Sequence, residues 1–315
     1  MISLIVRTLF CTAGLVCASA SLQGAFTIAN GQLIDADQMP TMSCEEHFQA
    51  GIAAYNSNDW LEAARHFRIV SRGFPNSSHC NEALFYLGVS EYEAEEYDMA
   101  NDAFCSYLAA QTNPRYFEEA VRYQLNIAEA YRCGAKKRFF GVRRFPKWAS
   151  GKEAAFEIYE SIITAMPSSE MAAYAMYAKG CLLWNSGDYQ DSIELFQQVI
   201  RRFPRHELAP CCYVSIIKAY RELTYYTWQN PDYLALAELA FCKFQADFPR
   251  EERLVTAEAD LQGIKELYAR GLYETGRLYE RKGTPCASKI YYQQALNQFP
   301  STQVAQLCES RLSEL

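Results

Sequence analysis

The chain has 315 residues, of which 50% are hydrophobic and 21% charged, and it carries a formal net charge of −7. This composition is ordinary for a globular protein and supplies enough apolar material for a core. The acidic balance argues against general nucleic-acid binding, which depends on many cations meeting phosphates. We therefore expect no nucleic-acid partner.

The N-terminus reads MISLIVRTLFCTAGLVCASA. Arg7 precedes an apolar run over residues 9–16, and the triplet Ala18-Ser19-Ala20 follows. Small residues at −3 and −1 fit a signal peptidase, so the sequence predicts a signal peptide over 1–20 that is cut after Ala20. A membrane-spanning helix is the weaker interpretation because Arg7 interrupts the apolar segment.

Cysteines leave two questions open. Lipidation of Cys17 or Cys11 is the alternative to cleavage after Ala20, although Val16 and Phe10, which are not small, stand just before them. The remaining ten of the 12 cysteines would reach an oxidising compartment after export. Their even number allows disulfides, but the sequence does not supply the pairing. No CxxC pair and no complete zinc-ligand set is present, so we expect no metal and no cofactor.

Residues 21–43 are expected to form an extended lead-in, and a repeat begins at residue 44. Five segments share a small residue twelve positions before a proline and an aromatic residue eight positions before it. These triplets are Ala63/Phe67/Pro75, Ala155/Tyr159/Pro167, Ser192/Phe196/Pro204, Ala237/Phe241/Pro249 and Ser288/Tyr292/Pro300. Four copies add a glycine twelve residues ahead of the small residue: Gly51, Gly88 (ahead of Ala100 and Phe104), Gly180 and Gly276.

This spacing is typical of the 34-residue tetratricopeptide repeat, a pair of antiparallel helices. The glycine and the small residue allow two helices to approach closely, the aromatic fills the space beside them, and the proline ends the second helix. The sequence predicts an all-α solenoid of about six helix pairs with a C-terminal capping helix. The expected repeats lie near 44–77, 81–114, 116–168, 169–205, 206–250 and 252–301, with the cap at 302–314. Residues 251–282 lack proline and are compatible with one long helix.

Two insertions carry the candidate partner-binding residues. The first, KKRFFGVRRFPKW over 136–148, contains six cations, four aromatics and no acidic residue. It is either a contact for an acidic partner or for phospholipid headgroups, or a structural insert whose aromatics pack back onto the repeat. The second is TYYTWQNPDY over 224–233. The candidate residues are Lys136, Lys137, Arg138, Phe139, Phe140, Arg143, Arg144, Trp148, Tyr225, Tyr226 and Trp228.

Catalytic machinery is not indicated. The chain has no GxSxG, HExxH or phosphate-binding glycine loop. The four histidines, His47, His66, His79 and His206, lie near repeat boundaries or on predicted helix faces, and His47 is expected to be packed. We therefore predict a scaffold and not an enzyme, because solenoid repeats hold peptides or partner helices.

Three stretches resemble the BamD family of outer-membrane β-barrel assembly lipoproteins. They are RFFGVRR (138–144), YYTWQNPDYLALAELAFCKFQADFP (225–249) and KELYARGLYETGRLYERKGTPCASKIYYQQALNQFPSTQVAQLCESRL (265–312). The first is similar to an insertion between two repeat helices of that family. The other two are similar to its aromatic loop and to its last repeat with the terminal helix.

The resemblance implies a periplasmic scaffold at the inner leaflet of the outer membrane of a Gram-negative-type bacterium. It implies docking on the barrel-forming subunit through the C-terminal repeats and contact with unfolded outer-membrane proteins toward the N-terminal repeats. The alternative is a generic periplasmic tetratricopeptide adaptor for cell-wall or division machinery.

Overall fold

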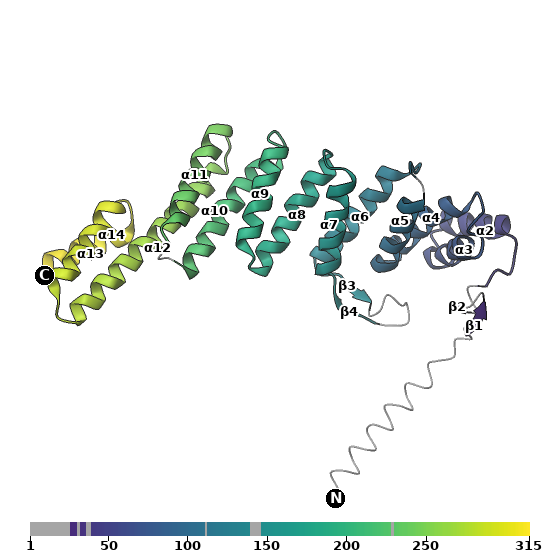
Figure 1. Ribbon diagram of the computed structural model, residues 1–315, viewed down its shortest axis with the longest axis horizontal. Coiled ribbons are helices and arrows are strands. Elements are labelled where there is room, and N and C mark those ends of the chain that lie inside the picture. Colours follow the sequence, from purple (N-terminus) through teal and green to yellow (C-terminus); the bar gives the residue numbers. More distant parts are fainter. Residues whose placement is uncertain (1–25, 30–31, 36–38, 111, 139–145, 228–229) are drawn as a thin grey trace, which may run out of the picture. The chain divides into compact units, whose positions relative to one another are not determined.

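The computed structural model describes residues 26–29, 32–35, 39–110, 112–138, 146–227 and 230–315 (Figure 1). Within these ranges the chain forms thirteen helices and four short strands. It divides into two compact units, one of residues 1–123 and 138–146 and one of residues 124–137 and 147–315. The fold is all-α in its core, as the repeat pattern predicts.

A β-hairpin precedes the helices where the sequence led us to expect only an extended lead-in. Strand β1 (Phe26–Ala29) pairs antiparallel with β2 (Gln32–Asp35), with Ala29 opposite Gln32. The residue pair between the strands in the sequence is Asn30-Gly31, which is typical of two-residue hairpin turns. The sequence of this segment therefore contains a hairpin signal, and residues 26–29 and 32–35 pair as strands within the expected extended lead-in.

The first unit is built from consecutive helix pairs. They are α2 (Cys44–Asn56) with α3 (Trp60–Gly73), then α4 (Cys80–Glu93) with α5 (Tyr97–Ala110). Helix α2 begins in a capping box, because the Ser43 hydroxyl accepts from the Glu46 amide at 3.3 Å and the Glu46 carboxylate accepts from the Ser43 amide at 2.9 Å. Each helix packs on the next, so the core of this unit is continuous from α2 to α5.

Helix α6 (Phe117–Arg132) carries the boundary between the units, which falls after Tyr123. The strands β3 (Lys136–Arg138) and β4 (Lys147–Ser150) follow and form a two-stranded sheet. They frame the basic-aromatic insert predicted between two repeat helices.

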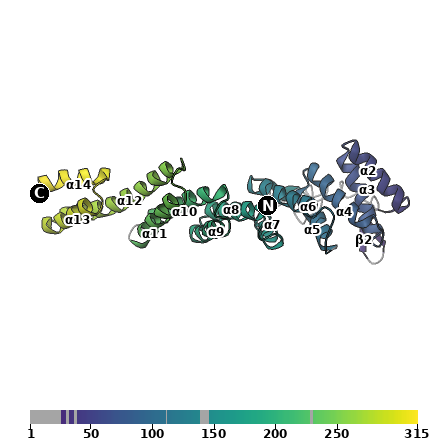
Figure 2. The ribbon, with the colours of Figure 1, turned by 90° about the horizontal axis from the view of Figure 1, so that it is seen from above.

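The second unit holds the other eight helices. They are α7 (Lys152–Ala165), α8 (Glu170–Ser186), α9 (Tyr189–Arg202), α10 (Leu208–Tyr226), α11 (Asp232–Asp247), α12 (Leu254–Arg281), α13 (Pro285–Gln298) and α14 (Gln303–Glu314). Helix α12 is a single helix of 28 residues that runs beside α13 (Figure 2). This confirms the expectation of one long helix from the proline-free stretch, and α14 confirms the terminal helix.

The aromatic-proline and methionine-proline steps end five helices with one geometry. The C-cap residues Phe74, Met166, Phe203, Phe248 and Phe299 all have φ between −135° and −130° and ψ between 54° and 65°. Proline clashes with a helical residue before it, so the preceding residue is pushed out of the α region. The predicted helix stops are thus confirmed.

Candidate partner-binding surface

Four glycine–aromatic contacts hold the helix pairs together. A β-carbon at Gly51 would lie 2.8 Å from Cε1 of Phe67, and one at Gly88 would lie 2.7 Å from Cε1 of Phe104. In the second unit, a β-carbon at Gly180 would lie 2.7 Å from Cε1 of Phe196, and one at Gly276 would lie 2.5 Å from Cε1 of Tyr292. These distances are well below a normal carbon contact, so only glycine fits there.

The small residue of the pattern lies in the same contact. Ala63 and Ala100 are fully buried, and the Ser192 hydroxyl donates to the Gly180 carbonyl at 3.0 Å. Each of the four aromatics is at most 1% exposed. These residues therefore build the scaffold and are not available to a partner.

Arg138 of the basic insert is used inside the first unit. Its guanidinium Nε lies 2.6 Å from Oε2 of Glu96 and its Nη2 lies 2.5 Å from Oε1, while its backbone amide donates to Asp98 at 3.3 Å. The side chains of Arg138 and Glu96 are largely buried, and the Glu96 carboxylate raises the pKa of Arg138. Arg138, which we expected to bind a partner, is an anchor of the insert.

The other predicted residues of this insert differ in exposure. Lys136 is exposed, Lys137 is half-buried, and Trp148 on β4 is 76% exposed. Phe139, Phe140, Arg143 and Arg144 lie outside the described residues. An indole that is open to solvent on a paired strand is unusual for a residue that packs back onto a core.

The second insertion is largely helical. Residues 224–226 form the last turn of α10 and residues 232–233 begin α11, so a shorter connection remains than the sequence suggested. No proline lies between Pro210, near the start of α10, and Pro231, and the buried Thr224 hydroxyl donates to the Tyr220 carbonyl at 2.8 Å. These features explain why the helix continues.

Tyr225 and Tyr226 stand on this last turn with 67% and 71% of their surface exposed. Their rings meet edge to face at 5.6 Å. Asn230, just before α11, is held by α12, because the Tyr268 hydroxyl donates to the Asn230 carbonyl. Trp228 lies outside the described residues. The tyrosine pair is thus an apolar surface displayed on a fixed helix end.

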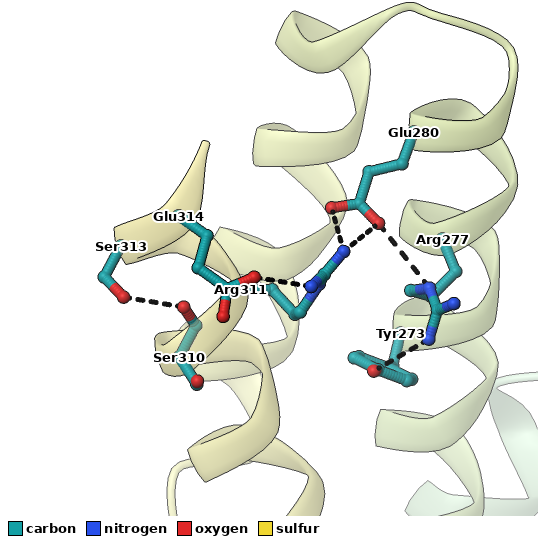
Figure 3. A network of polar contacts seen from close by, with 7 residues as sticks. All are labelled: Tyr273, Arg277, Glu280, Ser310, Arg311, Ser313 and Glu314. Atoms are coloured by element: carbon teal, nitrogen blue, oxygen red, sulfur yellow. Dashed lines mark hydrogen bonds and ion pairs between the residues drawn. The ribbon is translucent and has the colours of Figure 1, made fainter.

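A polar network at the C-terminus was not anticipated from the sequence. Arg311 of α14 donates to both oxygens of Glu280 on α12, at 3.0 and 3.2 Å, and pairs with Glu314 at 2.5 Å (Figure 3). Arg277 lies 3.5 Å from Glu280 and 3.4 Å from the Tyr273 hydroxyl. Arg311 and Glu280 are 31 positions apart, so no local pattern could pair them. The network fastens the terminal helix to α12.

Other sites offer little chemistry. The described residues contain no cluster of three metal-ligating side chains and no helix long and apolar enough to cross a membrane. No disulfide joins any of the described cysteines.

A groove of ≈ 600 Å³ runs along α7 between Phe156 and Ala165, and Nζ of Lys179 lies 4.2 Å from the centre of the Phe156 ring. We find no gathering of nucleophile, base and polarising group in these parts of the chain.

Paired helices, glycine–aromatic contacts in four of the pairs and proline stops define a tetratricopeptide-repeat protein. A tetratricopeptide-repeat sequence model matches residues 48–114. More specifically, the chain belongs to the YfiO family of outer membrane lipoproteins, whose sequence model matches residues 153–312. The BamD-type resemblance is thereby confirmed. No curated protein matches the chain.

Among solved structures, the chain is similar to a tetratricopeptide-repeat protein from Parabacteroides merdae. The two share 15% identity over 84% of this chain and 96% of that one, with a TM-score of 0.38. It is also similar to a structure titled MamA protein, with 18% identity over 68% and 94% of the two chains and a TM-score of 0.39.

Proposed function

We propose that the chain is a non-catalytic scaffold of the outer-membrane barrel-assembly machinery. It docks the barrel-forming subunit through its C-terminal helices and engages unfolded outer-membrane proteins. The observation that carries this proposal is the family match over residues 153–312, which covers α7 to α14. The family's description as outer membrane lipoproteins supports a position at the inner leaflet of that membrane.

The tyrosine pair supports docking through the second unit. Tyr225 and Tyr226 present apolar ring area and a hydroxyl that stays wet, a combination common at protein interfaces. Both stand on a helix whose backbone is already ordered, so little backbone entropy is lost when a partner binds. Trp148 provides a further exposed aromatic, and the cations of the basic insert would meet an acidic partner or lipid headgroups.

Affinity isolation from the cell envelope tests the proposal. The wild-type chain should recover the barrel-forming subunit, and the Tyr225→Ala/Tyr226→Ala variant should recover it with about tenfold or greater loss of affinity. Leu61→Ala on α3 is the matched control, because Leu61 is an apolar residue of similar exposure, 58%, that lies in the first unit. Recovery of peptidoglycan-linked proteins alone would contradict the proposal.

The alternative is an adaptor for cell-wall or division machinery. Tetratricopeptide repeats serve many unrelated partners, so the fold supports both functions. A chain that stays in the soluble periplasmic fraction and isolates no barrel-assembly protein would favour the adaptor. Mass analysis of the mature N-terminus separates a free Ser21 from a lipidated cysteine.

A further inference from the structure

A pair of buried histidines joins the first two helices. His47 of α2 is 1% exposed and His66 of α3 is 9% exposed. Their Nδ1 atoms lie 2.9 Å apart, which is hydrogen-bonding distance. One of the two nitrogens must donate and the other must accept, since two N–H groups or two lone pairs would repel each other.

The lead-in to the first repeat decides which nitrogen donates. The backbone amides of Thr41 and Met42 point at Nε2 of His47, at 3.2 and 3.3 Å. An amide can only donate, so Nε2 of His47 carries the lone pair and its hydrogen sits on Nδ1. Nδ1 of His66 must then accept, and its Nε2–H faces Glu62, 3.3 Å away. The chain of hydrogen bonds is complete only when both imidazoles are neutral.

An added proton breaks this series of hydrogen bonds at the amides of the lead-in. If the proton enters at Nδ1 of His66, His47 must accept at Nδ1 and move its own hydrogen to Nε2. If it enters at Nε2 of His47, the result at that atom is the same. In both cases an N–H of His47 faces the amides of Thr41 and Met42, and three donors then meet with no acceptor among them.

The charged groups around the pair are largely engaged elsewhere. On α2, Glu46 caps its own helix and Glu45 pairs with His79, whose ring stacks on Phe48. On α3, the Glu62 carboxylate that faces His66 also pairs with Arg65, and Arg68 pairs with Glu91 of α4. Burial lowers the pKa of His47, and the neighbouring His66 and Arg65 lower it further against a smaller opposing effect of Glu46.

A second contact, independent of protonation, holds the same segment. A β-carbon at Gly73 would lie 2.9 Å from Cγ of Pro40, so the proline ring lies against the end of α3. Residues 40–42 are therefore attached through one apolar contact and one contact that requires a neutral imidazole. Because the imidazole contact consists of two hydrogen bonds, from the amides of Thr41 and Met42, its loss would free the backbone that leads into α2.

We propose that the His47–His66 pair is a proton-controlled latch, which holds Thr41 and Met42 on the first helix pair when both imidazoles are neutral and releases them when the pair takes up a proton. The latch sets how firmly the segment before the repeats is attached, and it does not depend on the proposed function. It is distinct from global acid unfolding because the helices of the pair keep their own cores.

Amide hydrogen exchange of the full chain between pH 8 and pH 5 tests the latch, with each rate corrected for the intrinsic rate at that pH. The protection of the Thr41 and Met42 amides should fall about tenfold per pH unit once the pair titrates, as expected for one linked proton. Amides within α4 should keep their protection. A wild-type protection that is flat over this range would overturn the proposal.

Two variants sharpen the result. His47→Gln replaces the imidazole with an amide oxygen that accepts but does not titrate, so the protection at 41–42 should lose its pH dependence. His206→Gln is the matched control, because His206 lies in the second unit, and it should keep the wild-type dependence. If the protection of the Thr41 and Met42 amides in His47→Gln changed with pH as steeply as in the wild type, the latch would be refuted.

A measurement on the unmodified protein covers the case in which the variant folds poorly. Nitrogen-15 spectra at neutral pH should place the hydrogens on Nδ1 of His47 and Nε2 of His66. A hydrogen on Nε2 of His47 would contradict the arrangement on which the latch depends.

Discussion

The close approach of helices α8 and α9 predicts the cost of a single added methyl group. In Gly180→Ala, the new β-carbon would lie 2.7 Å from Cε1 of Phe196 and 3.1 Å from Cδ1 and Cζ. Carbon atoms in contact prefer about 3.5–4.0 Å, so the ring would have to move by about 1 Å in a core where it is 1% exposed. Overpacking of this kind costs about 1–3 kcal/mol.

Helix propensity acts in the opposite direction, and a matched variant isolates it. Alanine is favoured over glycine by about 1 kcal/mol within a helix. In Gly263→Ala on α12, the β-carbon would lie 3.6 Å from Cδ of Arg221, an ordinary contact, so only the propensity gain should remain. The two variants should therefore differ by about 1–3 kcal/mol, with Gly263→Ala the more stable.

Urea unfolding followed by circular dichroism measures the difference, provided both variants are compared at equal denaturant slope. A second change, Phe196→Leu, should restore part of the stability in the Gly180→Ala background, because the smaller side chain removes the clash. If Gly180→Ala were as stable as Gly263→Ala, the close helix contact would not be the reason for the glycine.

Two further predictions concern buried polar groups. Arg138→Ala leaves the Glu96 carboxylate without its bidentate partner and should lower the free energy of unfolding by about 2–4 kcal/mol. Lys136→Ala, an exposed neighbour on β3, should change it by no more than about 0.5 kcal/mol, and equal effects would contradict the anchor role. Burial raises the pKa of Tyr86 to about 12, above the value of 10.0 for a free phenol. The phenol of the unfolded chain therefore loses its proton first, and stability should fall as pH rises from about 10 to about 12. Alkaline unfolding of Tyr86→Phe against the wild type would check this, because the variant should lack this contribution.

Local signals in the sequence were read correctly where they act over a few residues. The proline after Phe203 or Phe299 dictates the backbone of the residue before it, so the helix stop follows from two letters of sequence. The β1–β2 hairpin has an equally local signal, Asn30-Gly31, but this single pair of residues stands out far less in the sequence than the repeat period that recurs along it.

Contacts between distant positions could not be found this way. Arg138 and Glu96 are 42 residues apart, and neither carries a pattern that marks it as paired. His47 and His66 meet only because α2 and α3 pack face to face. Which of their ring nitrogens donates and which accepts depends on the backbone amides of the lead-in. Sequence spacing assigns the cations of the insert to a surface, whereas in the described part of the insert Arg138 is an anchor, Lys136 is exposed and Lys137 is half-buried.

Helix α12 changes what counts as one cooperative element in this protein. Its Leu261 and Ile264 belong to the core around α10 and α11, while its Ala269 belongs to the core that holds Tyr292 of α13. At 1.5 Å per residue, the 28 residues span about 42 Å without a break. A lesion in the terminal core would thus weaken its neighbour through a shared backbone, and fraying from the C-terminus would not stop at the repeat boundary that the sequence displays.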